Sequence, residues 1–139
     1  MPKKYYLDTS IWRDYFEGRS NGLRPLGEWA WKLINLIIKD KNIFLYSDIV
    51  VQELKKYYPI ENINKTFAVA RVEGLLEKVY INPSQEKEAY KLSKNRKVSF
   101  HDALHAIIAR DEKAVLVARD KHFLKLLDII VPKKPEEII

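Results

Sequence analysis

The chain has 139 residues, of which 47% are hydrophobic and 32% charged, with a formal net charge of +6 and no cysteine. This length supports one sizeable core, so we expect a single domain spanning residues 1–139. Without cysteine there is no disulfide or thiolate metal site, and any metal must be bound by oxygen or imidazole. No apolar run approaches the roughly 20 residues of a membrane span and no signal peptide is evident, so we expect a cytoplasmic protein without membrane contact. The positive charge favours a polyanionic partner, although many basic proteins never bind nucleic acid.

Strand-like and helical segments alternate along the chain. In the first half we expect a strand at 5–7, a helix at 9–16, a loop at 17–27, a helix at 29–39, a strand at 43–46 and a helix at 48–57. In the second half we expect a helix through 67–76, an extended piece at 79–81, a break at Pro83, helices at 84–93 and 100–110, a strand at 114–118, a short helix at 121–127 and an apolar run at 129–131. This alternation predicts an α/β fold in which helices cover a parallel sheet.

Glu53 lies on the apolar side of its predicted helix. The apolar residues that share its arc on a helical wheel are Ile49, Val50, Leu54 and Tyr57. An ion pair with Lys56 is the ordinary explanation, but such a pair normally lies on the solvated face and contributes only ~0.2 to 0.5 kcal/mol. An inward carboxylate costs more than that unless something positive receives it.

Asp8 and Asp120 come at or just beyond the ends of the predicted strands at 5–7 and 114–118. In open α/β sheets, ligands bind at the carboxyl ends of the strands. Each of these acids also precedes a predicted helix, so N-capping is the ordinary alternative.

Asp102 fits a capping box with Ser99, which precedes it by three residues. On the helical wheel, however, Asp102 is flanked by the small residues Ala106 and Ala109. Small residues allow another element to approach closely, and this would direct the carboxylate toward other groups.

A chemical reason exists for gathering several carboxylates. Two like charges about 4 Å apart repel by roughly 4 kcal/mol at an effective dielectric of 20, and a divalent cation removes that repulsion. Oxygen ligands suit Mg²⁺ or Mn²⁺, which can activate water for attack on a phosphodiester. Phosphodiester hydrolysis is therefore our hypothesis.

Four segments carry the acids, and they are Tyr6–Ser10, Val51–Leu54, His101–Ala106 and Leu116–Phe123. In order and spacing they resemble the acidic motifs of PIN-domain nucleases over nearly the whole chain. The length and the lack of added domains look most like the stand-alone ribonuclease toxins called VapC.

The resemblance implies a three-layer α/β/α domain with a central, mainly parallel five-stranded sheet. It implies that Asp8, Glu53, Asp102 and Asp120 bind one or two Mg²⁺ or Mn²⁺ ions and carry out RNA cleavage, commonly in a homodimer. Thr9 and Ser10 would support the metal site or the substrate. Ala118 departs from the family pattern, which often has Thr there, so support for Asp120 would be weaker.

For substrate contact we expect Arg119, beside Asp120, and the basic residues Lys94, Arg96 and Lys97 ahead of the Asp102 helix. Phosphate contacts by such residues position nucleic acid without reading its sequence. The alternative is that they form an ordinary solvated surface.

Other functions remain open. His101, Asp102 and His105 resemble the H-E-x-x-H zinc protease motif, for which only His122 could be a third imidazole. A non-catalytic module that binds RNA or protein is a second alternative, and a housekeeping RNA-processing nuclease is a third. A toxin would need a small antitoxin that sends Arg or Lys toward the acids.

An antitoxin would also cover an apolar groove. Aromatic residues that could line it, if they are not in the core, are Trp12, Tyr15, Phe16 and Trp29.

Overall fold

The computed structural model describes all 139 residues and contains one sheet of four short strands. The strands are β1 (Lys4–Leu7), β2 (Ile43–Tyr46), β3 (Leu76–Lys78) and β4 (Val115–Val117). They pair in the order β3-β2-β1-β4, and every pair is parallel. The carboxyl ends of all four strands therefore lie at one edge of the sheet.

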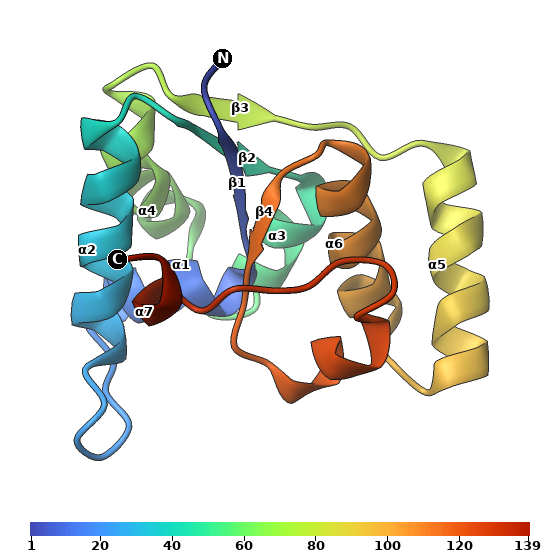
Figure 1. Ribbon diagram of the computed structural model, residues 1–139. Coiled ribbons are helices and arrows are strands. Elements are labelled where there is room, and N and C mark those ends of the chain that lie inside the picture. The colour runs from blue at the N-terminus through green and yellow to red at the C-terminus, as the bar shows by residue number, and fades with distance from the viewer.

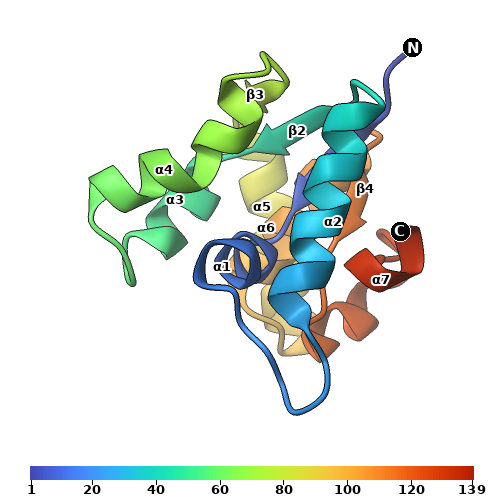
Figure 2. The same cartoon turned by 90° about the vertical axis from the view of Figure 1, so that its left-hand side faces the viewer.

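Helices cover both faces of this sheet (Figures 1 and 2). They are α1 (Thr9–Glu17), α2 (Leu26–Lys39), α3 (Asp48–Leu54), α4 (Ile60–Arg71), α5 (Pro83–Arg96), α6 (Phe100–Asp111), the 3₁₀ helix η1 (Lys121–Leu126) and α7 (Pro135–Ile138). On one face, Trp12 of α1 packs against Phe44 of β2 and Phe67 of α4. On the other, His105 of α6 packs against Tyr6 of β1, with α5 outside α6. The expected three-layer α/β/α architecture is confirmed.

A continuous core of 31 buried hydrophobic residues joins the layers. The strands β1, β2 and β4 are largely apolar on both faces because helices cover both, whereas the edge strand β3 carries the exposed Glu77 and Lys78. Each fully buried Leu, Ile or Phe contributes about 1.5–3 kcal/mol. Trp12 is fully buried in this core. It therefore cannot line an exposed groove, whereas Tyr15, Phe16 and Trp29 are half-buried.

The prediction of a fifth strand is wrong. The chain after η1 runs beside β4, but it makes only an isolated bridge, between Val117 and Lys133. The amide of Lys133 donates to Leu116, and the carbonyl of Lys133 accepts from Ala118. Pro132 and Pro135 flank this position and have no N–H to donate, so the pairing cannot extend into a strand.

Two expected boundaries also moved. β3 lies three residues before the expected 79–81, because α4 already ends at Arg71. Pro83 begins α5 rather than breaking the chain, because Asn82 and Gln85 form a capping box and proline is well suited to the first helical position.

The third helix is shorter than expected. α3 ends at Leu54, so Tyr57 lies beyond the helix and is 55% exposed instead of sharing the apolar face.

None of the helices combines the length and hydropathy that crossing a bilayer requires.

Candidate functional site

The four acids expected at the site line a single cleft of about 220 Å³. Asp8 directly follows β1, and Asp120 comes three residues after the end of β4. Glu53 lies on α3, which starts where β2 ends, and Asp102 lies in the first turn of α6, which runs back to the start of β4. The parallel topology thus places all four at the carboxyl edge of the sheet.

Asp8 is held by contacts other than helix capping. Its side chain makes no capping bond to α1 and instead accepts from the Ser10 hydroxyl at 2.9 Å. Its backbone N–H donates to Val117, which fixes Asp8 to the end of β4. The carboxyl is buried, and burial raises its pKa, an effect that His105 and Ser10 partly offset while Glu53 and Asp102 add to it.

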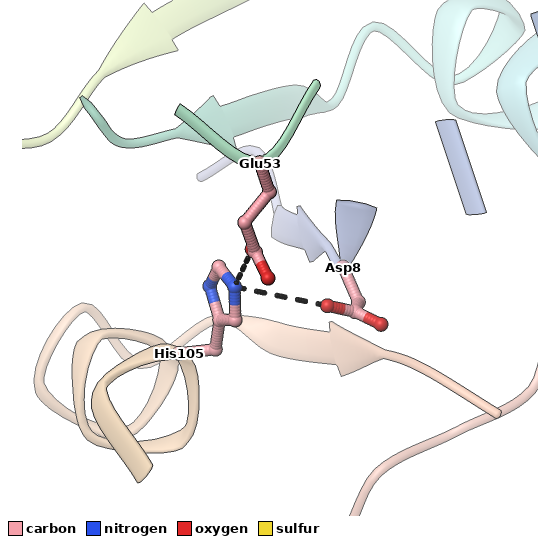
Figure 3. A group of neighbouring side chains, drawn as sticks. All are labelled: Asp8, Glu53 and His105. Atoms are coloured by element: carbon pink, nitrogen blue, oxygen red, sulfur yellow. Dashed lines mark hydrogen bonds and ion pairs between the residues drawn. The ribbon is translucent and has the colours of Figure 1, made fainter. Parts of the chain in front are cut away.

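Glu53 is turned inward, as the helical wheel predicts. Its Oε1 accepts from Thr9 Oγ1 at 2.8 Å and lies 2.6 Å from His105 Nε2 (Figure 3). No ion pair with Lys56 forms. Burial raises the pKa of Glu53, but the hydrogen bonds with His105 and Thr9 and the nearby His105 charge outweigh it, so this pKa lies below its ordinary value.

His105 lies beside Glu53 and Asp8 on the buried side of the cleft. It is completely buried, and its Nε2 lies 3.8 Å from Asp8 Oδ1 as well as beside Glu53. Its other nitrogen, Nδ1, lies 2.7 Å from the Tyr6 hydroxyl. Because both ring nitrogens are engaged, we regard His105 as a partner of the carboxylates and not as a ligand.

Asp102 and Asp120 form the second half of the cleft, and His122 lies beside them without lining it. The Ser99 hydroxyl accepts from the Asp102 backbone N–H and so caps α6, while the Asp102 carboxylate lines the cleft. Burial raises the pKa of Asp102, Ser99 partly offsets this, and the Asp120 charge adds to it.

Asp120 is the most exposed of the four acids. It caps η1 by accepting from the His122 backbone N–H, and the His122 ring lies 3.1 Å from Asp120 and 3.6 Å from Asp102. The support that Ala118 cannot provide thus comes from the residue two positions after Asp120.

Two of the expected substrate-contact residues are engaged elsewhere. Arg119 points away from the cleft and forms ion pairs with Glu136 of α7 at 2.6 Å and, more loosely, with Asp14 of α1. Arg96 binds Asp128 through both terminal nitrogens and also donates to the Lys125 carbonyl. Both guanidinium groups are paired with carboxylates in this structure, and contact of either one with a substrate stays a prediction.

The other two expected contacts are exposed but do not line the cleft. Lys94 lies over the Tyr90 ring, and Lys97 ends α5 in a left-handed conformation. The structure does not test whether either one touches a substrate.

The sequence reasoning missed three residues that line the cleft, Arg13, Lys56 and Tyr57. Arg13 lies one turn after Thr9 on α1, and Lys56 lies three residues after Glu53. That spacing from predicted site residues could have identified both. The stacking of Arg13 over Tyr57, 3.6 Å from its centroid, could not have been predicted.

The donor set fits a divalent metal ion of the hard type. Asp8, Glu53, Asp102 and Asp120 supply carboxylate oxygens, which Mg²⁺ and Mn²⁺ prefer. Burial, and to a lesser extent the neighbouring acids, raises the pKa values of Asp8 and Asp102, and a bound cation would oppose both effects. The histidines do not converge as the ligands of a zinc protease would. His105 lies with Asp8 and Glu53, His122 lies with Asp102 and Asp120, and His101 belongs to neither group.

Comparison with known proteins agrees with this geometry. The family model of the PIN domain matches residues 5–127, so the chain belongs to the PIN domain family, whose members are nucleases. No curated protein matches the sequence.

Three solved structures share the fold. A toxin–antitoxin complex from Klebsiella pneumoniae is 17% identical, with a TM-score of 0.62, over 94% of this chain and 98% of that one. VapBC2 from Rickettsia felis, bound to a DNA fragment from its promoter, is 19% identical, with a TM-score of 0.67 and the same coverages of 94% and 98%. PAE2754 from Pyrobaculum aerophilum is 16% identical, with a TM-score of 0.58, over 99% of this chain and 93% of that one.

Proposed function

We propose that this chain is an endoribonuclease that depends on Mg²⁺ or Mn²⁺ and hydrolyses RNA phosphodiester bonds. The observation that carries the proposal is the convergence of Asp8, Glu53, Asp102 and Asp120 on one cleft. Family membership supports nuclease chemistry, and the net charge of +6 supports a polyanionic substrate.

The four acids would bind the cation, and Thr9 and Ser10 would orient Glu53 and Asp8 through the hydrogen bonds that they donate. A bound divalent cation would supply an activated water and stabilise charge on the phosphodiester. His105 keeps Glu53 turned toward the cleft, and the neighbouring strand holds the Asp8 backbone.

Within the cleft we assign phosphate contact to Lys56 and Arg13, which line it with the acids. Lys56 is exposed and forms no ion pair, whereas Arg13 is paired with Glu17 through its Nε at 2.9 Å. A cation beside the acids would hold the backbone of the RNA without selecting its sequence.

The first experiment measures cleavage of a mixed, structured RNA pool with Mn²⁺, with Mg²⁺ and with EDTA. We expect cutting only with metal, and its loss in folded Asp8→Asn and Asp102→Asn variants. Asp40→Asn removes an exposed acid outside the cleft and should cut like wild type. An inactive wild type, or cleft variants that cut equally well, would reject the proposed nuclease mechanism.

We further propose that the enzyme is the toxin of a toxin–antitoxin pair and forms a homodimer. Two of the solved structures that share its fold are described as a toxin–antitoxin complex and as VapBC2. An antitoxin would place an Arg or Lys against the acids, because a cation relieves the same repulsion as a metal ion.

Expression in a bacterial host tests the toxin role. We expect growth arrest by wild type but not by Asp102→Asn, and recovery when the neighbouring reading frame is co-expressed. An active nuclease that purifies alone and leaves growth unchanged would be a housekeeping RNA-processing enzyme. Light scattering of the purified protein tests the dimer.

A further inference from the structure

A buried chain of hydrogen bonds runs beneath the cleft and ends on Glu53. Ser47, Tyr6 and His105 each have 0% of their surface exposed. The Tyr6 hydroxyl lies 2.7 Å from Ser47 Oγ and 2.7 Å from His105 Nδ1, and His105 Nε2 lies 2.6 Å from Glu53 Oε1. Figure 3 shows the end of this chain, with the imidazole directed at Glu53.

These groups are not explained by local structure. Ser47 occupies the N-cap position of α3, but its side chain makes no capping bond and its hydroxyl contacts Tyr6 instead. Tyr6 and His105 are 99 residues apart and lie on β1 and α6. None of the three lines the cleft. The chain therefore joins three elements of the fold to one site residue without touching the site's open space.

The direction of the hydrogen bonds follows from what each group can do. An ionised carboxylate can only accept, so His105 Nε2–H donates to Glu53. The Tyr6 hydroxyl bonds to Nδ1 and to Ser47 Oγ, and it thereby fixes the ring orientation that directs Nε2–H at Glu53.

Glu53 has its two oxygens in different surroundings as a result. Oε1 accepts from both His105 and Thr9, whereas Oε2 has the ring of His101 at 3.7 Å. Only Oε2 remains available to a ligand in the cleft.

We propose that Tyr6 and His105 are positioning residues that make Glu53 bind the cleft cation through Oε2 alone. This inference rests on the proposed function, because it requires a divalent cation at the four acids. Removal of a partner that orients a metal ligand in this way typically weakens metal binding by about 10- to 100-fold.

The test measures the Mn²⁺ dissociation constant by electron paramagnetic resonance for folded wild type and six variants. His105→Leu should weaken binding at least about tenfold, and His105→Gln, which retains an N–H donor, should recover part of that loss. Tyr6→Phe should weaken binding about fivefold, although Tyr6 touches no acid. Tyr5→Phe is the matched control, because this neighbouring tyrosine of β1 points to the opposite face of the sheet, and it should bind like wild type.

Thermal unfolding in EDTA separates positioning from general stability, since a structural role would lower the unfolding midpoint while leaving Mn²⁺ affinity unchanged. If Tyr6→Phe and His105→Leu bind Mn²⁺ as tightly as wild type, the positioning role is overturned and the proposed nuclease stands. If Asp8→Asn and Glu53→Gln also bind like wild type, the cation does not bind the acids and both proposals fail.

Discussion

The acids that line the cleft are gathered there at a cost in folding stability. Asp8 is 7% exposed, and its carboxylate lies near Glu53 and Asp102. Burying a charged group beside like charges is unfavourable unless a cation is present. The apo protein should therefore carry a cost at this residue.

Asp8→Asn should expose that cost. Replacing the carboxylate by an uncharged group of the same shape should raise the unfolding midpoint in EDTA, by a few degrees for a change of about 1 kcal/mol. The same variant should lose the increase that Mn²⁺ produces in wild type. Calorimetry with and without Mn²⁺ measures both effects. A variant less stable than wild type in EDTA would mean that Asp8 is chiefly structural.

Among the elements, α5 is held mainly by polar contacts. Only Gln85 and Ala89 of this helix are buried, and it lies outside α6 at the edge of the molecule (Figure 1). Arg110 of α6 donates two hydrogen bonds of 2.7 Å to the Glu88 carboxylate. The attachment of α5 should therefore respond to charge and pH more than the rest of the fold does.

Arg110→Gln should destabilise the protein at neutral pH by roughly 0.5 kcal/mol, a value reduced for the partial exposure of this pair. The hydrogen bonds from Arg110 hold the pKa of Glu88 below its ordinary value of 4.5. A lowered carboxyl pKa contributes stability above the ordinary pKa, and this contribution is lost as the pH falls through the lowered pKa. The difference between wild type and variant should thus be full at pH 7 and vanish well below pH 4.5.

Chemical denaturation across this pH range measures the difference. Lys91→Gln, which changes an exposed and unpaired cation of the same helix, should show no such dependence. A difference that persists in acid would mean that Arg110 acts through packing and not through the Glu88 charge.

For the whole molecule, the net charge of +6 contrasts with a cleft lined by four acids and two basic residues. Attraction of RNA would come from the general positive charge, and the cleft would need its cation before a phosphate could enter. Counterion release makes such attraction strongly dependent on salt.

In a non-cleaving Asp102→Asn background, the logarithm of the affinity for single-stranded RNA should fall linearly with that of the salt concentration. The slope is about −0.7 per contacted phosphate, so Lys56→Ala should make it shallower by about 0.7. Lys39→Ala is the control, because Lys39 precedes β2 and lies at the amino edge of the sheet. Fluorescence anisotropy measures both slopes, and an unchanged slope for Lys56→Ala would exclude phosphate contact by this residue.

Local spacing predicted much of the fold and of the cleft. The apolar runs predicted β1, β2 and β4, because strands covered on both faces are continuously apolar. The position of Asp8 and Asp120 beyond strands predicted their common edge, and the wheel around Glu53 predicted its inward orientation. These features depend only on residues that are close in the sequence.

Contacts between distant residues were decided only by the tertiary structure. From the sequence, Arg119 and Arg96 are predicted to contact the substrate. In the structure, Arg119 binds Glu136, 17 residues away, and Arg96 binds Asp128, 32 residues away. The fifth strand was lost because the prolines beside Lys133 stop its pairing with β4. The chain from Ser47 through Tyr6 to His105 joins residues up to 99 positions apart, and a hydrogen bond over that separation has no local pattern. The sequence by itself therefore determined which acids meet, and the packing of distant elements determined what holds each of them in place.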